Sequence, residues 1–223
     1  MNPPTLVIGN KNYSSWSLRP WLFMKHSGVP FTEVRVPLYQ PGSAEELRRY
    51  SPSGLVPVLL DGKVTVWDSL AICEYVSERF LDGRGWPADI AARAAARSVS
   101  AEMHAGFQSV RANLPMNLRA RFAGKHISAE VDAGIRRITA IWEQCRREHG
   151  AGGPWLFGAF SIADAMYAPV AWRFLSYGVA LEGEAAGYQQ TLLAMPEMQA
   201  WQANGIKESE VLPGCEARDV WPA

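Results

Sequence analysis

The chain has 223 residues, of which 48% are hydrophobic, and it carries 22 basic and 22 acidic side chains. This length and hydrophobic content suit one large globular domain or two small ones. The balanced charge gives no electrostatic case for binding nucleic acid or an anionic membrane.

The first 80 residues or so alternate strand and helix patterns. "TLVIG" is a short buried strand, residues 15–27 form a helix that stops at Gly28, and "FTEVRVPL" alternates like a second strand. "SAEELRRY" is a short helix, and "VPVLLDGKVTVW" holds two strands joined by the hairpin signal Asp61-Gly62. An apolar stripe marks "DSLAICEYVSERF" as a helix. The order β-α-β-α-β-β-α predicts a small α/β domain over residues 1–82.

The rest of the chain, residues 89–223, has helical patterns after a linker rich in glycine and proline. We expect the alanine-rich first helix to break near Pro115, and the tail from Ile206 to pack back over the N-terminal domain. This part therefore predicts an all-α bundle of four or five helices. The expected helices are residues 88–122, a helix capped by Ser128, residues 161–178, and residues 188–204 with a restart at Pro196.

No stretch approaches the roughly 18 apolar residues that span a membrane, and the N-terminus lacks the pattern of a secretory signal. Cys73, Cys145 and Cys215 have neither CxxC nor metal-site spacing. We therefore expect a cytoplasmic protein without a metal site, whose cysteines are buried or incidental thiols.

Four motifs stand at the junctions of these elements. Pro57 begins a strand just before the hairpin, within "SGLVPVLLDG". Asp68 and Ser69 begin the next helix, where free N–H groups and the helix dipole favour a carboxylate. Ser161 and Asp164 form the S-x-x-D capping box of an apolar helix. The turn "NKNYSSWSLRPWL" places several hydroxyls between the first strand and the first helix.

This order of elements and these motifs resemble the cytosolic glutathione S-transferase family, nearest to bacterial members with a serine-type, zeta-like N-terminal motif. The resemblance covers essentially the whole chain. It implies a thioredoxin-like N-terminal domain, an all-α C-terminal domain, glutathione as co-substrate and no metal. It also implies a homodimer and a role in detoxification. Zeta-class members isomerise maleylacetoacetate or dehalogenate small acids.

The resemblance implies that three of the motifs bind glutathione. The family has a cis-proline where Pro57 stands, and the backbone of Val56 would pair with the peptide as an added strand does. Asp68 would attract the ammonium of the γ-glutamyl end, and Ser69 would bind its carboxylate. From the residues alone, an ordinary proline at the start of a strand and a plain helix cap remain alternative interpretations.

In "SSWSLR", Ser14 falls on the family's catalytic serine and Ser15 on its second, glutathione-binding serine. Arg19 falls on the family's arginine, whereas Trp16 replaces its cysteine. A hydroxyl that donates to the sulfur stabilises the nucleophilic thiolate. We therefore expect Ser14 to activate the thiol, with Ser15 and Tyr13 as alternatives. Ser14 could also merely cap the helix.

Trp16, Met103, Phe107 and Arg111 are the candidate residues for binding the electrophile. The family binds electrophiles between the domains, and helical spacing can turn the last three toward such a cleft. Arg111 would then select anionic substrates, although Met and Phe are also ordinary core residues. We expect His104 at the surface or between the domains, and not as a catalyst.

The leading hypothesis is a glutathione S-transferase that adds the glutathione thiolate to a small electrophile or isomerises one. Two alternatives stay open. A thiol–disulfide reductase normally needs a cysteine in the first turn, and residues 10–22 have none. A non-catalytic binding or assembly module could use the same fold.

Overall fold

A computed structural model describes residues 2–122 and 128–216. Its N-terminal part has the predicted order of strands and helices. The elements are β1 (Thr5–Ile8), α1 (Ser15–His26), β2 (Thr32–Arg35), α2 (Ser43–Tyr50), β3 (Val58–Asp61), β4 (Val64–Trp67) and α3 (Ser69–Leu81).

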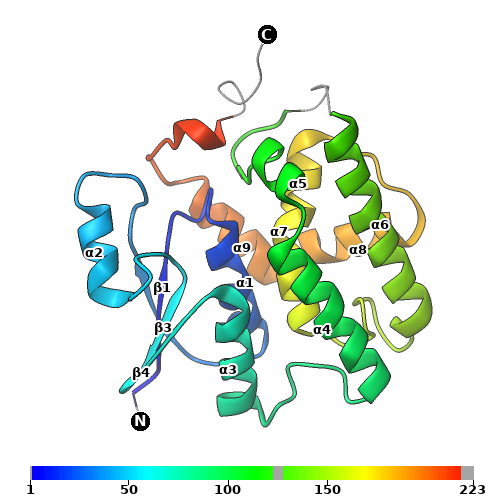
Figure 1. The fold of residues 1–223 in the computed structure, drawn as a ribbon, viewed down its shortest axis with the longest axis horizontal. Helices are drawn as coiled ribbons and strands as arrows, with labels where there is room; N and C mark the ends of the chain where they lie inside the picture. Colours follow the sequence, from blue (N-terminus) through cyan, green and yellow to red (C-terminus); the bar gives the residue numbers. More distant parts are fainter. Residues whose placement is uncertain (1, 123–127, 217–223) are drawn as a thin grey trace.

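The four strands form one mixed sheet in the order β2-β1-β3-β4, in which only β1 and β2 run parallel. Successive side chains of a strand point to opposite faces. Leu6 and Ile8 therefore pack with α1, α3 and the helical part of the chain, whereas Val7 packs with Leu47 of α2. Figure 1 shows α2 on one side of the sheet and α1 and α3 on the other. The structure thus confirms the thioredoxin-like arrangement.

Six α-helices follow among the described residues, one or two more than expected. Helix α7 is buried along almost its whole length and packs against α1, α4 and α8 (Figure 1). None of the helices in the described ranges combines the length and the apolarity that crossing a membrane requires. The helices are α4 (Ile90–Ala105), α5 (Gln108–Asn113), α6 (Ala129–His149), α7 (Ile162–Tyr177), α8 (Gly183–Ala194) and α9 (Pro196–Gly205), with a 3-10 turn, η1, over Pro213–Cys215.

The expectation of one helix up to a break near Pro115 is wrong. Helix α4 already ends before Gly106, where a Cβ atom would lie 2.7 Å from the carbonyl oxygen of Glu102. Phe107 follows in the left-handed conformation, with φ of 59°, and α5 restarts the helix in a new direction. Helix α5 ends at Asn113, shortly before the proline, because a proline disfavours helical geometry in the residue before it.

The tail from Ile206 packs back over the N-terminal domain, as expected, as far as it is described. The Glu208 carboxylate accepts hydrogen bonds from the backbone N–H groups of Lys11, at 2.8 Å, and Asn12, at 3.1 Å. Arg35 of β2 forms an ion pair of 2.9 Å with Glu210. The remaining tail, residues 217–223, lies outside the described residues. The domain boundaries at residues 82 and 89, between α3 and α4, stay a prediction.

The capping box at the start of α7 is fully buried. The Asp164 carboxylate accepts hydrogen bonds from the backbone N–H groups of Leu156 and Ser161, at 3.0 and 2.8 Å. The hydroxyls of Ser161 and Tyr188 also donate to it, at 3.1 and 3.0 Å. One carboxylate therefore joins the start of α7 to the preceding loop and to α8.

We predict that Asp164→Ala lowers the free energy of unfolding by about 2–4 kcal/mol, because it leaves several buried donors without an acceptor. Ser128→Ala is the matched control. Ser128 caps the exposed start of α6 through one hydrogen bond, so its loss should cost only about 1 kcal/mol. Denaturant unfolding of both variants measures the difference. Equal losses would show that Asp164 is no more than an ordinary cap.

Candidate active site

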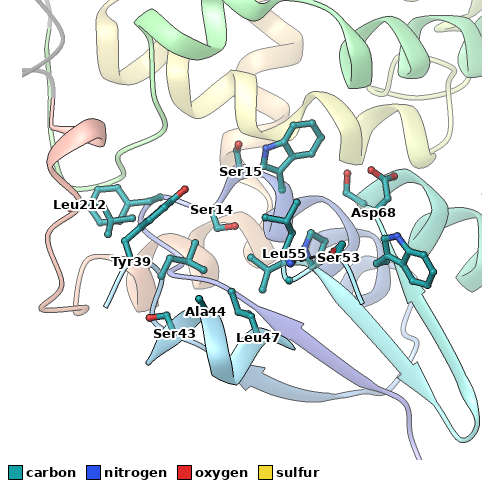
Figure 2. A pocket seen from close by; sticks show the side chains of 18 of the residues that line it. Ser14, Ser15, Tyr39, Ser43, Ala44, Leu47, Ser53, Leu55, Asp68 and Leu212 are labelled. Carbon is teal, nitrogen blue, oxygen red and sulfur yellow. Dashed lines mark hydrogen bonds between the residues drawn. The ribbon is translucent and has the colours of Figure 1, made fainter. Parts of the chain in front are cut away.

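A cavity of about 600 Å³ lies where the starts of α1 and α3, helix α2 and the loop before β3 meet the C-terminal segment. Figure 2 shows Ser14 and Ser15 between Leu212 and Tyr39 on one side and Leu55 and Asp68 on the other. The walls of the cavity combine apolar side chains with hydroxyls from α1 and the start of α3. The cavity is large enough for a small peptide.

The loop between β1 and α1 is fixed by side chains from both domains. The Asn12 side chain accepts from the backbone N–H groups of Leu118 and Arg119, at 2.9 and 3.1 Å, and donates to Asn117 at 3.2 Å. The indole of Trp201 donates to the Lys11 carbonyl at 2.9 Å. The backbone that leads into the two serines is therefore tied to the helical domain.

Ser14 and Ser15 both line the cavity, but their hydroxyls have different partners. Ser14 caps α1: its Oγ accepts from the Ser17 N–H at 3.3 Å and donates to the Ser17 hydroxyl at 2.8 Å. Ser15 accepts a hydrogen bond of 2.9 Å from the guanidinium of Arg173 in α7. The capping role that the sequence left open for Ser14 is therefore present.

Tyr13, the third candidate donor, points its hydroxyl toward the C-terminal segment. It donates to Glu216 at 2.6 Å and accepts from Arg119 at 2.5 Å. Burial, followed by the hydrogen bond to Glu216, raises the pKa of Tyr13 above its usual value. Its proton therefore already has a carboxylate acceptor, which disfavours Tyr13 as the donor to a bound thiol.

The segment before β3 presents free backbone to the cavity. The Val56–Pro57 peptide bond is cis, as the resemblance implied. Both residues line the cavity, and the backbone N–H and C=O of Val56 have no hydrogen-bond partner among the described residues. An extended peptide can pair with such groups as an added strand does.

The start of α3 faces the same cavity. Asp68 caps the helix by accepting from the N–H groups of Leu70 and Ala71, at 2.9 and 3.2 Å. The N–H of Ser69, the first residue of the helix, is thereby left for a ligand. The Ser69 hydroxyl is fully buried and accepts from Arg19 at 3.4 Å. A carboxylate bound here would meet a helix N-terminus backed by a cation.

The other carboxylate oxygen of Asp68 lies 3.1 Å from Nε2 of His104. Burial lowers the pKa of His104; Asp68 opposes this shift, whereas Arg19 and Arg111 add to it. The imidazole is therefore neutral at neutral pH and carries no charge that would compete with an ammonium group of a ligand for Asp68. His104 belongs to the interdomain residues, as expected, and it lines the cavity.

Trp16 contacts two guanidinium groups. The guanidinium carbons of Arg19 and Arg111 lie 4.4 and 4.7 Å from its ring centre, within the range of cation–π contacts. The ring of His104 meets its edge, with 5.3 Å between centres. Trp16 lines the cavity. The zeta-class pattern has a cysteine at this position, so this part of the cavity wall carries an aromatic ring in place of a thiol.

The other candidate electrophile residues do not line the cavity. Met103 is buried in the core, and Phe107 packs against that core. The guanidinium of Arg111 donates to the carbonyls of Met103, His104 and Gly106, and so caps the end of α4. The expectation assumed one continuous helix, and the break at Phe107 removes the spacing on which it depended.

Several lining residues were not predicted from the sequence. Tyr39, Leu55 and Trp67 are 86%, 67% and 47% exposed and give the cavity an apolar mouth. Cys215 of η1 also lines it, and burial raises the pKa of its thiol. Tyr39 and Leu55 come from loops and Cys215 from the tail, where no periodic pattern indicates which way a side chain points, and Trp67 is the last residue of β4.

Among the residues that the structure describes, no group of three or more His, Cys, Asp or Glu is arranged to hold a metal ion.

Curated relatives match only a part of this chain. A dichloromethane dehalogenase of Methylorubrum extorquens is 46% identical over 65 residues, which are 28% of this chain and 22% of that protein. A second dichloromethane dehalogenase, from Methylophilus leisingeri, is 38% identical over 69 residues, or 29% of this chain and 25% of the relative. The chain thus matches about a quarter of the length of these relatives.

Solved structures match nearly the whole chain. A glutathione transferase homolog from Burkholderia with bound glutathione has a TM-score of 0.69 at 21% identity, over 92% of this chain and 98% of that one. A theta-class enzyme from Xanthomonas axonopodis pv. citri, also with glutathione bound, has a TM-score of 0.64 at 18% identity, over 94% and 99%. At these identities the likeness shows the fold alone.

Family membership follows from two sequence models that together cover more than half of the chain. The model described as "Glutathione S-transferase, N-terminal domain" matches residues 13–79, which include the serines and the start of α3. The model described as "Glutathione S-transferase, C-terminal domain" matches residues 125–201, which include the capping box. The chain therefore belongs to the glutathione S-transferase family.

Proposed function

We propose that this chain is a serine-type, metal-independent glutathione transferase that adds the glutathione thiolate to a small electrophile or isomerises one. The cavity carries the proposal, because it joins three kinds of group that a γ-glutamyl peptide with a thiol requires. These are the unpaired backbone of Val56, the carboxylate and helix start at Asp68 and Ser69, and the hydroxyls of Ser14 and Ser15.

In the proposed complex, each end of glutathione meets a complementary group. The cysteinyl backbone pairs with Val56 beside Pro57. The γ-glutamyl carboxylate lies at the start of α3 with Ser69, and the ammonium lies against Asp68. This arrangement directs the thiol toward the start of α1, where the serines stand.

Addition of glutathione to an electrophile requires little beyond a stabilised thiolate. A free thiol has a pKa near 8.5, so it is mostly protonated at neutral pH, and the thiolate is the nucleophile. A serine hydroxyl that donates to sulfur, together with the dipole of α1, lowers that pKa by about one or two units. The apolar mouth formed by Tyr39, Leu55 and Trp67 would hold the electrophile beside the sulfur.

The names of the curated relatives suggest a first electrophile to test. They are dichloromethane dehalogenases, so displacement of halide from a small haloalkane belongs in the substrate panel beside larger aromatic electrophiles. In such a displacement, a carbon–sulfur bond forms as the carbon–halogen bond breaks, and halide leaves with the electron pair.

We further propose that the protein works as a homodimer in the cytoplasm. The two alternative functions explain the residues of the cavity less well than a transferase does. A binding module has no need of the pairing groups at Val56 and Asp68. A reductase needs a reactive thiol, and the raised pKa of Cys215 keeps that thiol protonated at neutral pH.

We predict that Asp68→Asn raises the KM for glutathione about tenfold and leaves kcat nearly unchanged. The reason is that it removes a charge that stabilises bound glutathione in the ground state and in the transition state equally. Asparagine caps a helix as well as aspartate does, so α3 should persist. Asp89→Asn at the cap of α4, outside the cavity, is the matched control. Steady-state kinetics with varied glutathione measure both, and an unchanged KM in Asp68→Asn would contradict the glutamyl site.

We predict that wild-type protein is retained on glutathione-agarose and that alanine at one of the two serines, Ser14 or Ser15, lowers kcat/KM by about 10–100-fold near pH 6.5. The size follows from losing one or two units of thiol pKa. Conjugation assays with a haloalkane and an aromatic electrophile measure it. Protein that flows through the resin would favour the binding module, and full activity in both variants would reject the serine-type mechanism.

A further inference from the structure

Arg173 is a buried cation with no carboxylate partner among the described residues. It stands in α7 and is 7% exposed. One terminal guanidinium nitrogen, Nη1, donates to the carbonyls of Leu114 and Arg111, and the second, Nη2, donates to the Ser15 hydroxyl at 2.9 Å. Burying a charge without an opposite charge is costly, so its contact with the cavity wall needs an explanation beyond packing.

This contact decides what the Ser15 hydroxyl can do. A hydroxyl has one proton to donate and lone pairs that accept. In Ser15 the oxygen accepts from a cation, and no described residue accepts its proton. Because Ser15 lines the cavity, that proton is available to a ligand there. A hydroxyl that accepts from a charged donor is polarised and becomes a stronger donor itself.

Ser14 lacks this freedom. Its hydroxyl donates to Ser17, and its oxygen accepts from the backbone of the same residue. The Ser17 oxygen in turn accepts from the Gly9 N–H at 3.1 Å. Donation from Ser14 to a ligand would break a buried chain of hydrogen bonds that holds the β1–α1 turn.

Two more guanidinium groups lie close to the part of the cavity wall that Ser15 forms. Arg19 and Arg111 stack on Trp16, the residue next to Ser15. Burial, together with the charges of Arg111 and Arg173, lowers the pKa of Arg19 to about 9, and burial and Arg111 lower that of Arg173 to about 10. Both groups stay protonated at neutral pH. An anion at Ser15 would therefore relieve mutual repulsion among these cations.

We propose that Arg173 is a positioning residue that polarises the Ser15 hydroxyl from the helical domain, and that Ser15 is the group that donates to the glutathione sulfur. The proposal rests on the proposed function and assigns the roles within it. Thiol activation would then depend on contact between the two domains, because the cation stands in one and the hydroxyl in the other.

The test is a pH titration of glutathione bound to each purified variant, followed by the ultraviolet absorbance of the thiolate. Arg173→Met and Ser15→Ala should each raise the thiol pKa by about one unit, with a tenfold lower rate below that pKa. The double variant should be no worse than Ser15→Ala, because the cation acts through the hydroxyl. Arg173→Lys keeps a donor and should restore part of the shift.

Arg146→Met is the matched control. Its guanidinium also donates to backbone carbonyls, those of Gly153 and Trp155 at 2.7 Å each, but it lies outside the cavity. This variant should leave the thiol pKa unchanged even if it lowers stability. If Arg173→Met does not fold, Arg173→Lys and Ser15→Ala decide the question.

Two results would overturn the inference while glutathione still binds. One is a raised pKa in Ser14→Ala with no change in Ser15→Ala. The other is a double variant whose effects add fully. A wild-type protein that binds no glutathione would instead reject the proposed function itself.

Discussion

The turn between β1 and α1 is held in place by residues of the helical domain and of the tail that follows it, and the site depends on this constraint. Glu208 accepts from the backbone of Lys11 and Asn12, and Asn12 in turn binds the backbone at Leu118 and Arg119. A turn of this kind carries backbone donors and acceptors that must be paired when they are buried. The partners come from the helical domain, so the serines are fixed only when both domains are folded together.

Positive charge is concentrated where the β1–α1 turn meets the helical domain. Arg19 and Arg173 are buried there, and Arg111 is shared between the end of α4 and the face of Trp16. Among the described residues that line the cavity, the only acidic one is Asp68, which already caps α3. Helix starts add partial positive charge at two walls of the cavity. The site is therefore built to receive an anion, which fits a thiolate and a carboxylate.

Trp16 explains how such cations can stand close together. Its ring makes cation–π contacts with the guanidinium groups of both Arg19 and Arg111. A cysteine, which the zeta-class pattern has at this point, could not do so. The substitution therefore changes the wall of the cavity without removing the hydroxyls on which the proposed chemistry depends.

Local patterns were enough to predict most of the fold. The hairpin at Asp61-Gly62, the stop of α1 at Gly28 and the cap at Ser128 each depend on neighbouring residues, and each is present in the structure. The break at Phe107 was missed because only Gly106, the cap that follows α4, marks it in the sequence, and a single glycine in an alanine-rich stretch is a weak signal.

The site was predictable only where a motif lies within one element. Ser69 begins α3 and Pro57 directly precedes β3, and both line the cavity. Cys215 lines the cavity and Arg173 binds the lining residue Ser15, and both lie more than 150 residues beyond the serines in the chain. The sequence predicted α7 as an apolar helix with a capping box, but it could not show that one of its side chains would end at Ser15.

The most direct test of this account is a crystal structure of the protein with glutathione bound, read for the distances from the sulfur to each serine hydroxyl. The account predicts that the sulfur lies within hydrogen-bond distance of the Ser15 oxygen, that Arg173 still donates to that oxygen, and that the γ-glutamyl carboxylate lies at Ser69. A sulfur bonded to Ser14 or Tyr13, with Ser15 turned away, would contradict it.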